Sequence, residues 1–273
     1  MPLSKKLLLP IIGIVTIALA ISVSMCVQKP EKTNSLENIA KLLPKDYTYM
    51  VFITKEGYGE FVSSLSSSEI DLKNLGIKEG DLLIGRKNES IIIMISKLSL
   101  GDMMKIEEYL VKNAPPDVKI EKYHGYEIWT LPSEEGGVAF RGDRFVASSS
   151  IKDYLDFLTE PKETFYDNED VRYMAKRLPY GIINIIRLPE KDEKLEAIGF
   201  SIVRKISNDS YEAFLIVKPI TKREAKEIKE SIEQGTPSKN FKCEIFDEYI
   251  ECRGTMEKKV ATEVVESLIE YRH

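Results

Sequence analysis

The chain opens with an apolar segment, and its hydrophobic and polar positions then follow the periods of short helices and strands. Leu7–Val27 runs for 21 residues without a charged side chain. A helix of about 20 residues spans the hydrocarbon core of a bilayer. We therefore interpret residues 1–27 as a signal-anchor or transmembrane helix, and the polar residues 28–34 as a linker to a folded body.

After the linker, helices and strands alternate to the end of the chain. Apolar positions three and four residues apart predict helices, and apolar–polar alternation between turn residues predicts strands. The expected helices cover Ser35–Leu43, Ser99–Asn113, Ile151–Leu158, Glu169–Leu178, Thr221–Gln234 and Thr255–Tyr271. The expected strands cover Tyr47–Thr54, Asp81–Gly85, Glu89–Ser96, Asp117–Lys122, Tyr126–Leu131, Gly137–Arg141, Arg144–Ser148, Tyr180–Arg187, Leu195–Arg204, Tyr211–Val217, Phe241–Phe246 and Tyr249–Arg253.

The order of these elements indicates an internal repeat. Residues 35–160 and 161–273 each read α-β-β-β-α-β-β-α, with an added hairpin in the first stretch. The capping pairs Ser99/Asp102 and Thr221/Glu224 open the two middle helices at the same offset of 122 residues. We predict two degenerate repeats in an α+β fold. Because hairpins dominate, we expect mainly antiparallel sheets with helices on one face.

The N-terminal segment has three alternative fates. Its length favours an uncleaved single-pass anchor, since the apolar region of an ordinary signal peptide is about 7–15 residues long. Val23-Ser24-Met25-Cys26 resembles a lipobox, which would make Cys26 a lipidation site, although Met25 departs from the small residue expected there. The small residues Ser22-Val23-Ser24 would also suit simple cleavage.

Several weak signals place the folded body outside the cytoplasm. Lys5 and Lys6 favour a cytoplasmic N-terminus, whereas the lysines that follow the apolar segment favour the opposite orientation. A long domain, however, is translocated largely regardless of its charge. The tripeptides at Asn88 and Asn208 match the N-glycosylation pattern, and both lie in predicted turns where they would be accessible.

Composition and charge exclude several classes of protein. The chain is 43% hydrophobic and 30% charged, which is ordinary for a folded soluble body and excludes a polytopic membrane protein. The formal net charge is −5, and the body has no basic stripe, so we expect no nucleic-acid partner. For the same reason we expect contact with the membrane through residues 7–27 rather than through the body.

Two cysteines near the C-terminus are positioned to form a disulfide. With a two-residue turn at Asp247-Glu248, Cys243 lies directly opposite Cys252 in a hairpin. Cα atoms of such opposed residues come as close as about 4.5 Å, which is within the range that a disulfide accepts. We favour a disulfide in an oxidising compartment; the alternative is a pair of small thiols that fill the core.

Candidate chemistry is sparse. The only histidines are His124 and His273, which excludes a site that needs several imidazoles. The sequence contains no G-x-S-x-G, H-E-x-x-H, P-loop or G-x-G-x-x-G motif. His124 lies in a predicted turn beside Gly125. A solvated turn side chain is a simpler interpretation of this histidine than a general base. We therefore predict no catalytic, cofactor-binding or metal-binding residue, and no cofactor.

The leader Val23–Cys26 and the segment Lys41–Tyr47, which leads into a strand, resemble those of membrane-anchored or lipoprotein-like envelope proteins of archaea. Abundant Lys and Glu, with Gln28 and Gln234 as the only glutamines, resemble the usage of thermophiles. The resemblance implies an envelope protein and brings no catalytic residues. We expect a membrane-tethered, extracytoplasmic binding or interaction protein. The alternatives are an envelope hydrolase with an unrecognised acidic site and an accessory subunit of a membrane complex.

Overall fold

The computed structural model describes residues 35–61, 77–130, 136–189, 194–235 and 241–269, which belong to one structural unit, Asn34–His273. The predicted membrane segment, the linker and Cys26 lie outside these residues. Among the described residues, no helix combines the length and the apolar character needed to cross a bilayer.

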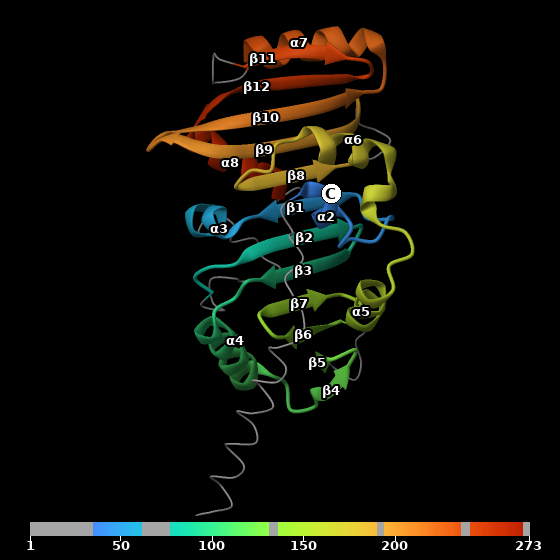
Figure 1. Cartoon of the computed structure of the whole chain (residues 1–273), viewed down its shortest axis with the longest axis vertical. Helices are drawn as coiled ribbons and strands as arrows, with labels where there is room; N and C mark the ends of the chain where they lie inside the picture. The colour runs from blue at the N-terminus through green and yellow to red at the C-terminus, as the bar shows by residue number, and fades with distance from the viewer. Residues whose placement is uncertain (1–34, 62–76, 131–135, 190–193, 236–240, 270–273) are drawn as a thin grey trace, which may run out of the picture. The chain divides into compact units, whose positions relative to one another are not determined.

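Twelve strands form one continuous sheet in the order β11-β12-β10-β9-β8-β1-β2-β3-β7-β6-β5-β4 (Figure 1). Every neighbouring pair is antiparallel. The strands are β1 Tyr49–Ile53, β2 Asp81–Lys87, β3 Ser90–Ser96, β4 Lys119–Tyr123, β5 Tyr126–Thr130, β6 Gly137–Arg141, β7 Arg144–Ser148, β8 Ile183–Arg187, β9 Leu195–Ser207, β10 Ser210–Pro219, β11 Lys242–Phe246 and β12 Tyr249–Glu257. The α+β class and the antiparallel pairing are as predicted.

Helices cover both faces of the sheet, so the expectation of helices on one face is wrong. The helices are α2 Leu36–Ala40, α3 Lys55–Phe61, α4 Leu100–Asn113, α5 Ile151–Thr159, α6 Glu169–Arg177, α7 Lys222–Gly235 and α8 Lys258–Ile269, with a 3₁₀ turn η2 at Phe165–Asp167. Residues of α3, α4, α7 and α8 pack into one apolar cluster, and residues of α2, α5 and α6 pack into another.

The physical reason lies in the central strands. In β1, Val51 and Ile53 join the first cluster, whereas Met50 and Phe52 join the second, and all four are buried. Because successive side chains of a strand point to opposite faces, an uninterrupted apolar strand needs cover on both sides.

The two predicted repeats meet at the centre of the sheet, where β1 pairs with β8. The orders α2-β1-α3-β2-β3-α4 and α6-β8-β9-β10-α7 match except for α3, which has no counterpart between β8 and β9, and the corresponding helices join the same apolar clusters. The outer parts differ, because four strands follow α4 whereas two follow α7. A common origin of the two halves stays a prediction.

Local chemistry explains where the middle helices begin. The Ser99 hydroxyl accepts a hydrogen bond from the Asp102 backbone N–H at 3.1 Å. The Thr221 hydroxyl accepts one from the Glu224 N–H at 3.3 Å, and the Glu224 carboxylate accepts one from the Thr221 N–H at 3.2 Å. Both capping pairs therefore start a helix as the sequence predicts.

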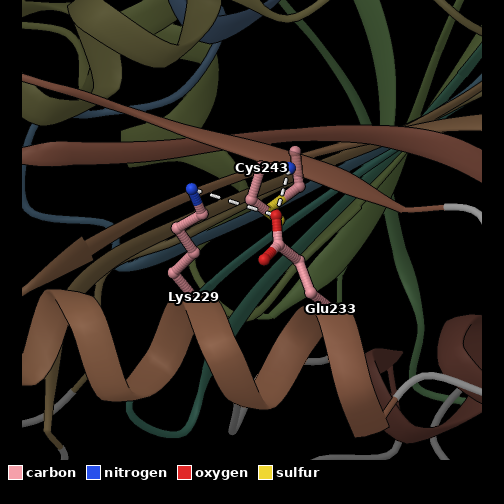
Figure 2. The surroundings of a disulfide bond; sticks show 4 residues. Lys229, Glu233 and Cys243 are labelled. Atoms are coloured by element: carbon pink, nitrogen blue, oxygen red, sulfur yellow. Dashed lines mark hydrogen bonds and ion pairs between the residues drawn. A yellow bond between two sulfur atoms is a disulfide. The ribbon is translucent and has the colours of Figure 1, made fainter.

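The C-terminal hairpin has the predicted register, with Cys243 opposite Cys252 and Phe246 opposite Tyr249. A disulfide joins the two cysteines, whose Cα atoms are 4.1 Å apart. Figure 2 shows that α7 runs beside this edge of the sheet, where the Glu233 carboxylate accepts a hydrogen bond from the Cys243 backbone N–H at 3.0 Å. Lys229 in turn lies 3.9 Å from that carboxylate. The helix thus provides a hydrogen-bond acceptor for a backbone N–H of the edge strand β11, which would otherwise be unpaired.

Candidate functional site

A groove of about 960 Å³ lies beside the connection between the two predicted repeats, residues 35–160 and 161–273. Three parts of the chain contribute to it: the segment before β1, the turn between β4 and β5, and the stretch from α5 to the start of α6. Its lining residues are Pro44, Lys45, Asp46, His124, Asp156, Phe157, Thr159, Glu160, Lys162, Glu163 and Asn168. The groove therefore combines residues from both repeats.

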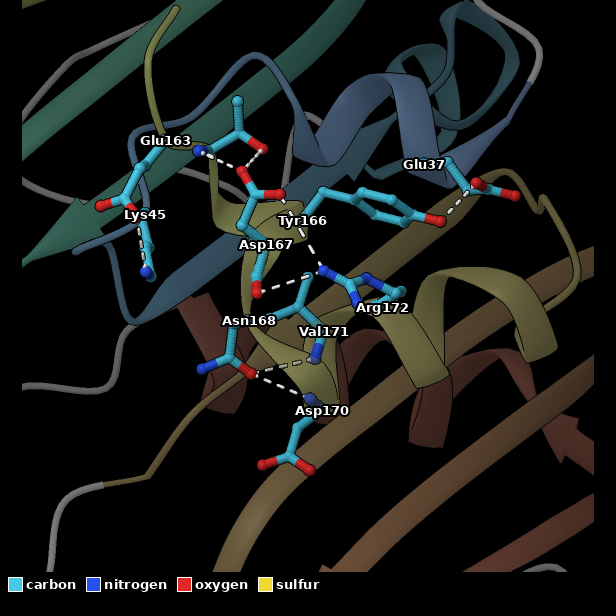
Figure 3. Close-up of polar contacts among 10 residues, drawn as sticks. Glu37, Lys45, Glu163, Tyr166, Asp167, Asn168, Asp170, Val171 and Arg172 are labelled. Carbon is cyan, nitrogen blue, oxygen red and sulfur yellow. Dashed lines mark hydrogen bonds and ion pairs between the residues drawn. The ribbon is translucent and has the colours of Figure 1, made fainter.

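Capping interactions fix one wall of the groove (Figure 3). The Asp167 carboxylate accepts hydrogen bonds from the backbone N–H and the hydroxyl of Thr164, at 2.8 and 2.9 Å. The Asn168 side-chain oxygen accepts bonds from the N–H groups of Asp170 and Val171, at 2.9 and 3.3 Å, and so begins α6. These bonds hold Asn168, which lines the groove, in one orientation.

A short backbone bridge ties the connection between the repeats to the segment before β1. Pro44 and Thr164 form an antiparallel bridge, and the Lys45 N–H donates to the Glu163 carbonyl oxygen at 3.2 Å. Nζ of Lys45 also donates to the Glu163 carboxylate at 2.9 Å, and this bond raises the pKa of Lys45. The bridge brings together two segments that are 118 positions apart in the chain.

The groove lining also contains His124 and Asp156, which form a polar cluster with Tyr123. Oδ1 of Asp156 accepts a hydrogen bond from the Tyr123 hydroxyl at 2.8 Å and lies 2.8 Å from Nε2 of His124. The bond from Tyr123 lowers the pKa of Asp156, and His124 lowers it further. The carboxyl group is therefore ionised at neutral pH and presents a negative charge to the groove.

The charge of the lining determines which ligands the groove suits. It presents the carboxylates of Asp46, Asp156, Glu160 and Glu163 and the ammonium groups of Lys45 and Lys162, which leaves an excess of two negative charges when His124 is neutral. Phe157 adds an apolar surface. Such a lining complements a polar ligand that carries positive charge.

Among the described residues, the carboxyl groups whose pKa departs from its ordinary value have it lowered rather than raised: Glu60, Asp102, Asp156, Asp167 and Glu212. A general acid for glycoside hydrolysis needs a raised pKa. The described part of the chain also contains no group of three or more His, Cys, Asp or Glu side chains placed to hold a metal ion.

Of the candidate site residues that the structure describes, His124 lines the groove, whereas Asn88, Asn208, Cys243 and Cys252 do not. Asn88 and Asn208 are exposed in the β2–β3 and β9–β10 turns, as predicted. Asp156 and Glu163 were missed. Asp156 comes directly after Leu155, which belongs to the apolar stripe of α5. A polar residue at that position indicates a solvated helix face rather than a site.

No protein family model matches the chain, and no curated protein matches its sequence. Solved structures of TP0453 share its fold. Crystal form III aligns with a TM-score of 0.56 and 9% identity, over 84% of this chain and 97% of that one. Crystal forms I and IV align with TM-scores of 0.55 and 0.56, at 11% and 10% identity, over 84% of this chain and 96% of that one. The chain thus has a TP0453-like fold of the α+β class; at this identity the likeness concerns the fold alone.

Proposed function

We propose that this protein is a membrane-tethered, extracytoplasmic binding protein whose ligand occupies the groove between the repeats. The observation that carries the proposal is a groove whose lining side chains come from both predicted repeats and are held by hydrogen bonds, at Glu163, Asn168 and Asp156. Binding sites of this kind are concave and largely preformed, with a few polar groups that orient the ligand.

The charge of the groove supports a cationic ligand. We propose a small polyamine or the basic side chains of a peptide, because the lining has two more carboxylates than ammonium groups. The carboxylates would accept hydrogen bonds from ammonium groups, and Phe157 would contact the alkyl chain between them.

The extracytoplasmic location rests on separate observations. Leu7–Val27 supports a membrane tether, since its apolar length suits a bilayer. The disulfide between Cys243 and Cys252 is consistent with an oxidising compartment, and the exposed turns at Asn88 and Asn208 would leave both glycosylation tripeptides accessible there. The leader also supports the proposed resemblance to archaeal envelope proteins.

Titration of the full-length protein tests the ligand class. The protein is extracted in a neutral detergent and titrated with spermidine and with trilysine at constant ionic strength, with binding followed by calorimetry. We expect saturable binding that D156N and E160Q each weaken several-fold. The control is E230Q on the exposed face of α7, outside the groove, which should bind like the native protein. Absence of saturable binding, or equal weakening in E230Q, would show that the ligand class is wrong.

Protease accessibility tests the location independently. Protease added to intact cells should digest the body while the N-terminal segment stays with the membrane. If digestion requires broken cells, the body lies inside the cell and the proposed location is refuted. That result would not bear on the proposal that the groove binds a ligand. Recovery of the full-length chain from cytosol without detergent would refute the tether.

A further inference from the structure

A second polar cluster, which shares no residue with the groove, lies on β9, β10 and β12. The Glu212 carboxylate on β10 lies between Arg204 on β9 and Arg253 on β12. Nε of Arg204 donates to Oε2 at 2.8 Å, and Nε of Arg253 donates to Oε1 at 2.9 Å. Nη2 of Arg253 also donates to Oε1. One carboxylate thus orients two guanidinium groups.

Burial within the cluster is uneven. The Glu212 side chain is 11% exposed, whereas those of Arg204 and Arg253 are 72% and 64% exposed. Arginine has five N–H donors, so the bonds to Glu212 leave outer N–H groups of both guanidinium groups directed to solvent. The guanidinium carbon of Arg253 lies over the Phe214 ring, 5.8 Å from its centroid, in a cation–π contact.

The position of the cluster on the sheet keeps it accessible. β8 pairs with β9 only as far as Ile202, so Arg204 lies on the part of β9 that extends past β8. The register pairs Arg253 with Phe214, whose ring packs into the apolar cluster of α2, α5 and α6. The helices α7 and α8 pack into the other cluster, on the opposite face of the sheet.

The site is concave and carries excess positive charge. It has a volume of about 460 Å³ and is lined by Arg204, Lys205, Ile206, Glu212, Arg253, Gly254 and Thr255. Two guanidinium groups face one carboxylate, and Nζ of Lys205 is engaged by Glu60 at 3.1 Å. Lys242, which is exposed and lies opposite Arg253 in the register, adds a further positive charge beside the site.

We propose that Arg204 and Arg253 form a binding site for an oxyanion, either a carboxylate or a phosphate group. One arginine would suffice to neutralise Glu212, so the second leaves a fixed, exposed positive charge. The outer N–H groups of a guanidinium match two oxygens of such an anion in a fork that lysine cannot form. Glu212 acts as a positioning residue, because it holds both guanidinium groups in place before the anion arrives.

Titration of the full-length protein in neutral detergent with inorganic phosphate or acetate tests the site. Ionic strength is held constant, and binding is followed by calorimetry and by the Nε–H NMR signals of the arginines. We expect saturable binding that shifts the signals of Arg204 and Arg253. R204K and R253K should each weaken it about tenfold. R223K is the matched control, because Arg223 is an exposed arginine of α7, 3.8 Å from Glu227. Absence of saturable binding, or equal weakening by R223K, would overturn the proposal.

The NMR signals of the native protein keep the test valid where a variant fails to fold. Phosphate that shifts the Arg223 signal as much as those of Arg204 and Arg253 would overturn the proposal. Lipid vesicles distinguish two sources of the anion. If vesicles of anionic phospholipid displace the bound phosphate and vesicles of neutral lipid do not, the natural ligand is a lipid headgroup. If the phosphate stays bound in the presence of both, the ligand is a soluble oxyanion. Either outcome, together with dependence on the two arginines, supports the site.

Discussion

Nε2 of His124 lies 2.8 Å from Oδ1 of Asp156, which connects the β4–β5 turn to α5 at the groove. The same oxygen accepts a hydrogen bond from the Tyr123 hydroxyl. The Tyr123 ring meets the imidazole ring edge-on, at a centroid distance of 4.6 Å. His124 has a positive φ of 47°, which turns the chain so that both side chains reach one carboxylate. A histidine that the sequence places in a solvated turn thereby contributes to a groove wall.

The pKa of Asp156 tests this arrangement. Its ordinary value is 3.8, and the hydrogen bond from Tyr123 is the largest of the effects that lower it. A carboxyl group with a lowered pKa stabilises the fold above its unfolded pKa, and that contribution is lost as the pH falls through the lower folded value. We expect Y123F to raise the pKa of Asp156 toward its ordinary value, as measured by the pH dependence of its ¹³C carboxyl shift.

The control for this titration is Y166F. The Tyr166 hydroxyl donates to Glu37 at 2.5 Å rather than to Asp156, so its removal should leave the Asp156 titration unchanged. An Asp156 pKa that is the same in Y123F and in the native protein would mean that the hydroxyl does not bond the carboxylate in solution.

The second prediction concerns the disulfide. Reduction of Cys243–Cys252 should lower the free energy of unfolding by about 2–3 kcal/mol, because the bond closes a short loop in the unfolded chain. Urea unfolding followed by the fluorescence of Trp129, the single tryptophan, measures the change with and without reductant. Mass analysis under non-reducing conditions is the check on the bond itself, and two free thiols in the native protein would contradict it.

Much of the fold follows from local pattern. The register of the C-terminal hairpin was predictable because a two-residue turn at Asp247 sets every opposed pair up to Cys243 and Cys252. The starts of α4 and α7 were predictable because Ser99 and Thr221 satisfy backbone N–H groups within three residues. Interactions of this range depend on few positions, so the sequence around them suffices.

What the sequence did not predict depends on distant contacts. α3 was missed because Gly57 and Gly59 make Lys55–Phe61 a poor helix by propensity. Gly57 is required by packing, since a Cβ there would lie 2.3 Å from the Ile182 carbonyl oxygen. The groove was missed because it also depends on contacts between distant positions. Lys45 and Glu163, for example, become neighbours only in the folded chain, in which β1 pairs with β8.

The third prediction concerns the edge of the sheet at β11. E233A removes the carboxylate that accepts the Cys243 backbone N–H, and an unsatisfied donor of this kind costs about 1–3 kcal/mol. We expect lower stability in urea and faster hydrogen exchange at the Cys243 amide. The matched control is E230A, which lies on the same helix 4.0 Å from Lys226 and should change stability by less than about 0.5 kcal/mol. Equal exchange rates in the two variants would show that Glu233 does not protect the edge.

The last prediction concerns a fully buried polar side chain in the central strand β8. Oδ1 of Asn184 accepts bonds from the Gly181 N–H and the Ser201 hydroxyl, both at 3.0 Å, and its Nδ2 donates to the Gly181 carbonyl oxygen at 2.8 Å. N184A would leave both backbone groups of Gly181 without that partner inside the protein. Because each buried, unsatisfied group costs about 1–3 kcal/mol, we expect a loss of at least about 2 kcal/mol in urea unfolding.

A matched asparagine separates this effect from the general cost of replacing an amide. Asn113 is exposed, and its side chain donates to the Tyr109 carbonyl oxygen at 2.7 Å near the end of α4. N113A should change the free energy of unfolding by less than about 0.5 kcal/mol, because water replaces the lost bond. Two variants of equal stability would mean that Asn184 is not the buried hydrogen-bonding centre that joins the start of β8 to β9. A large difference would show that the buried hydrogen bonds of Asn184 stabilise the start of β8 against β9.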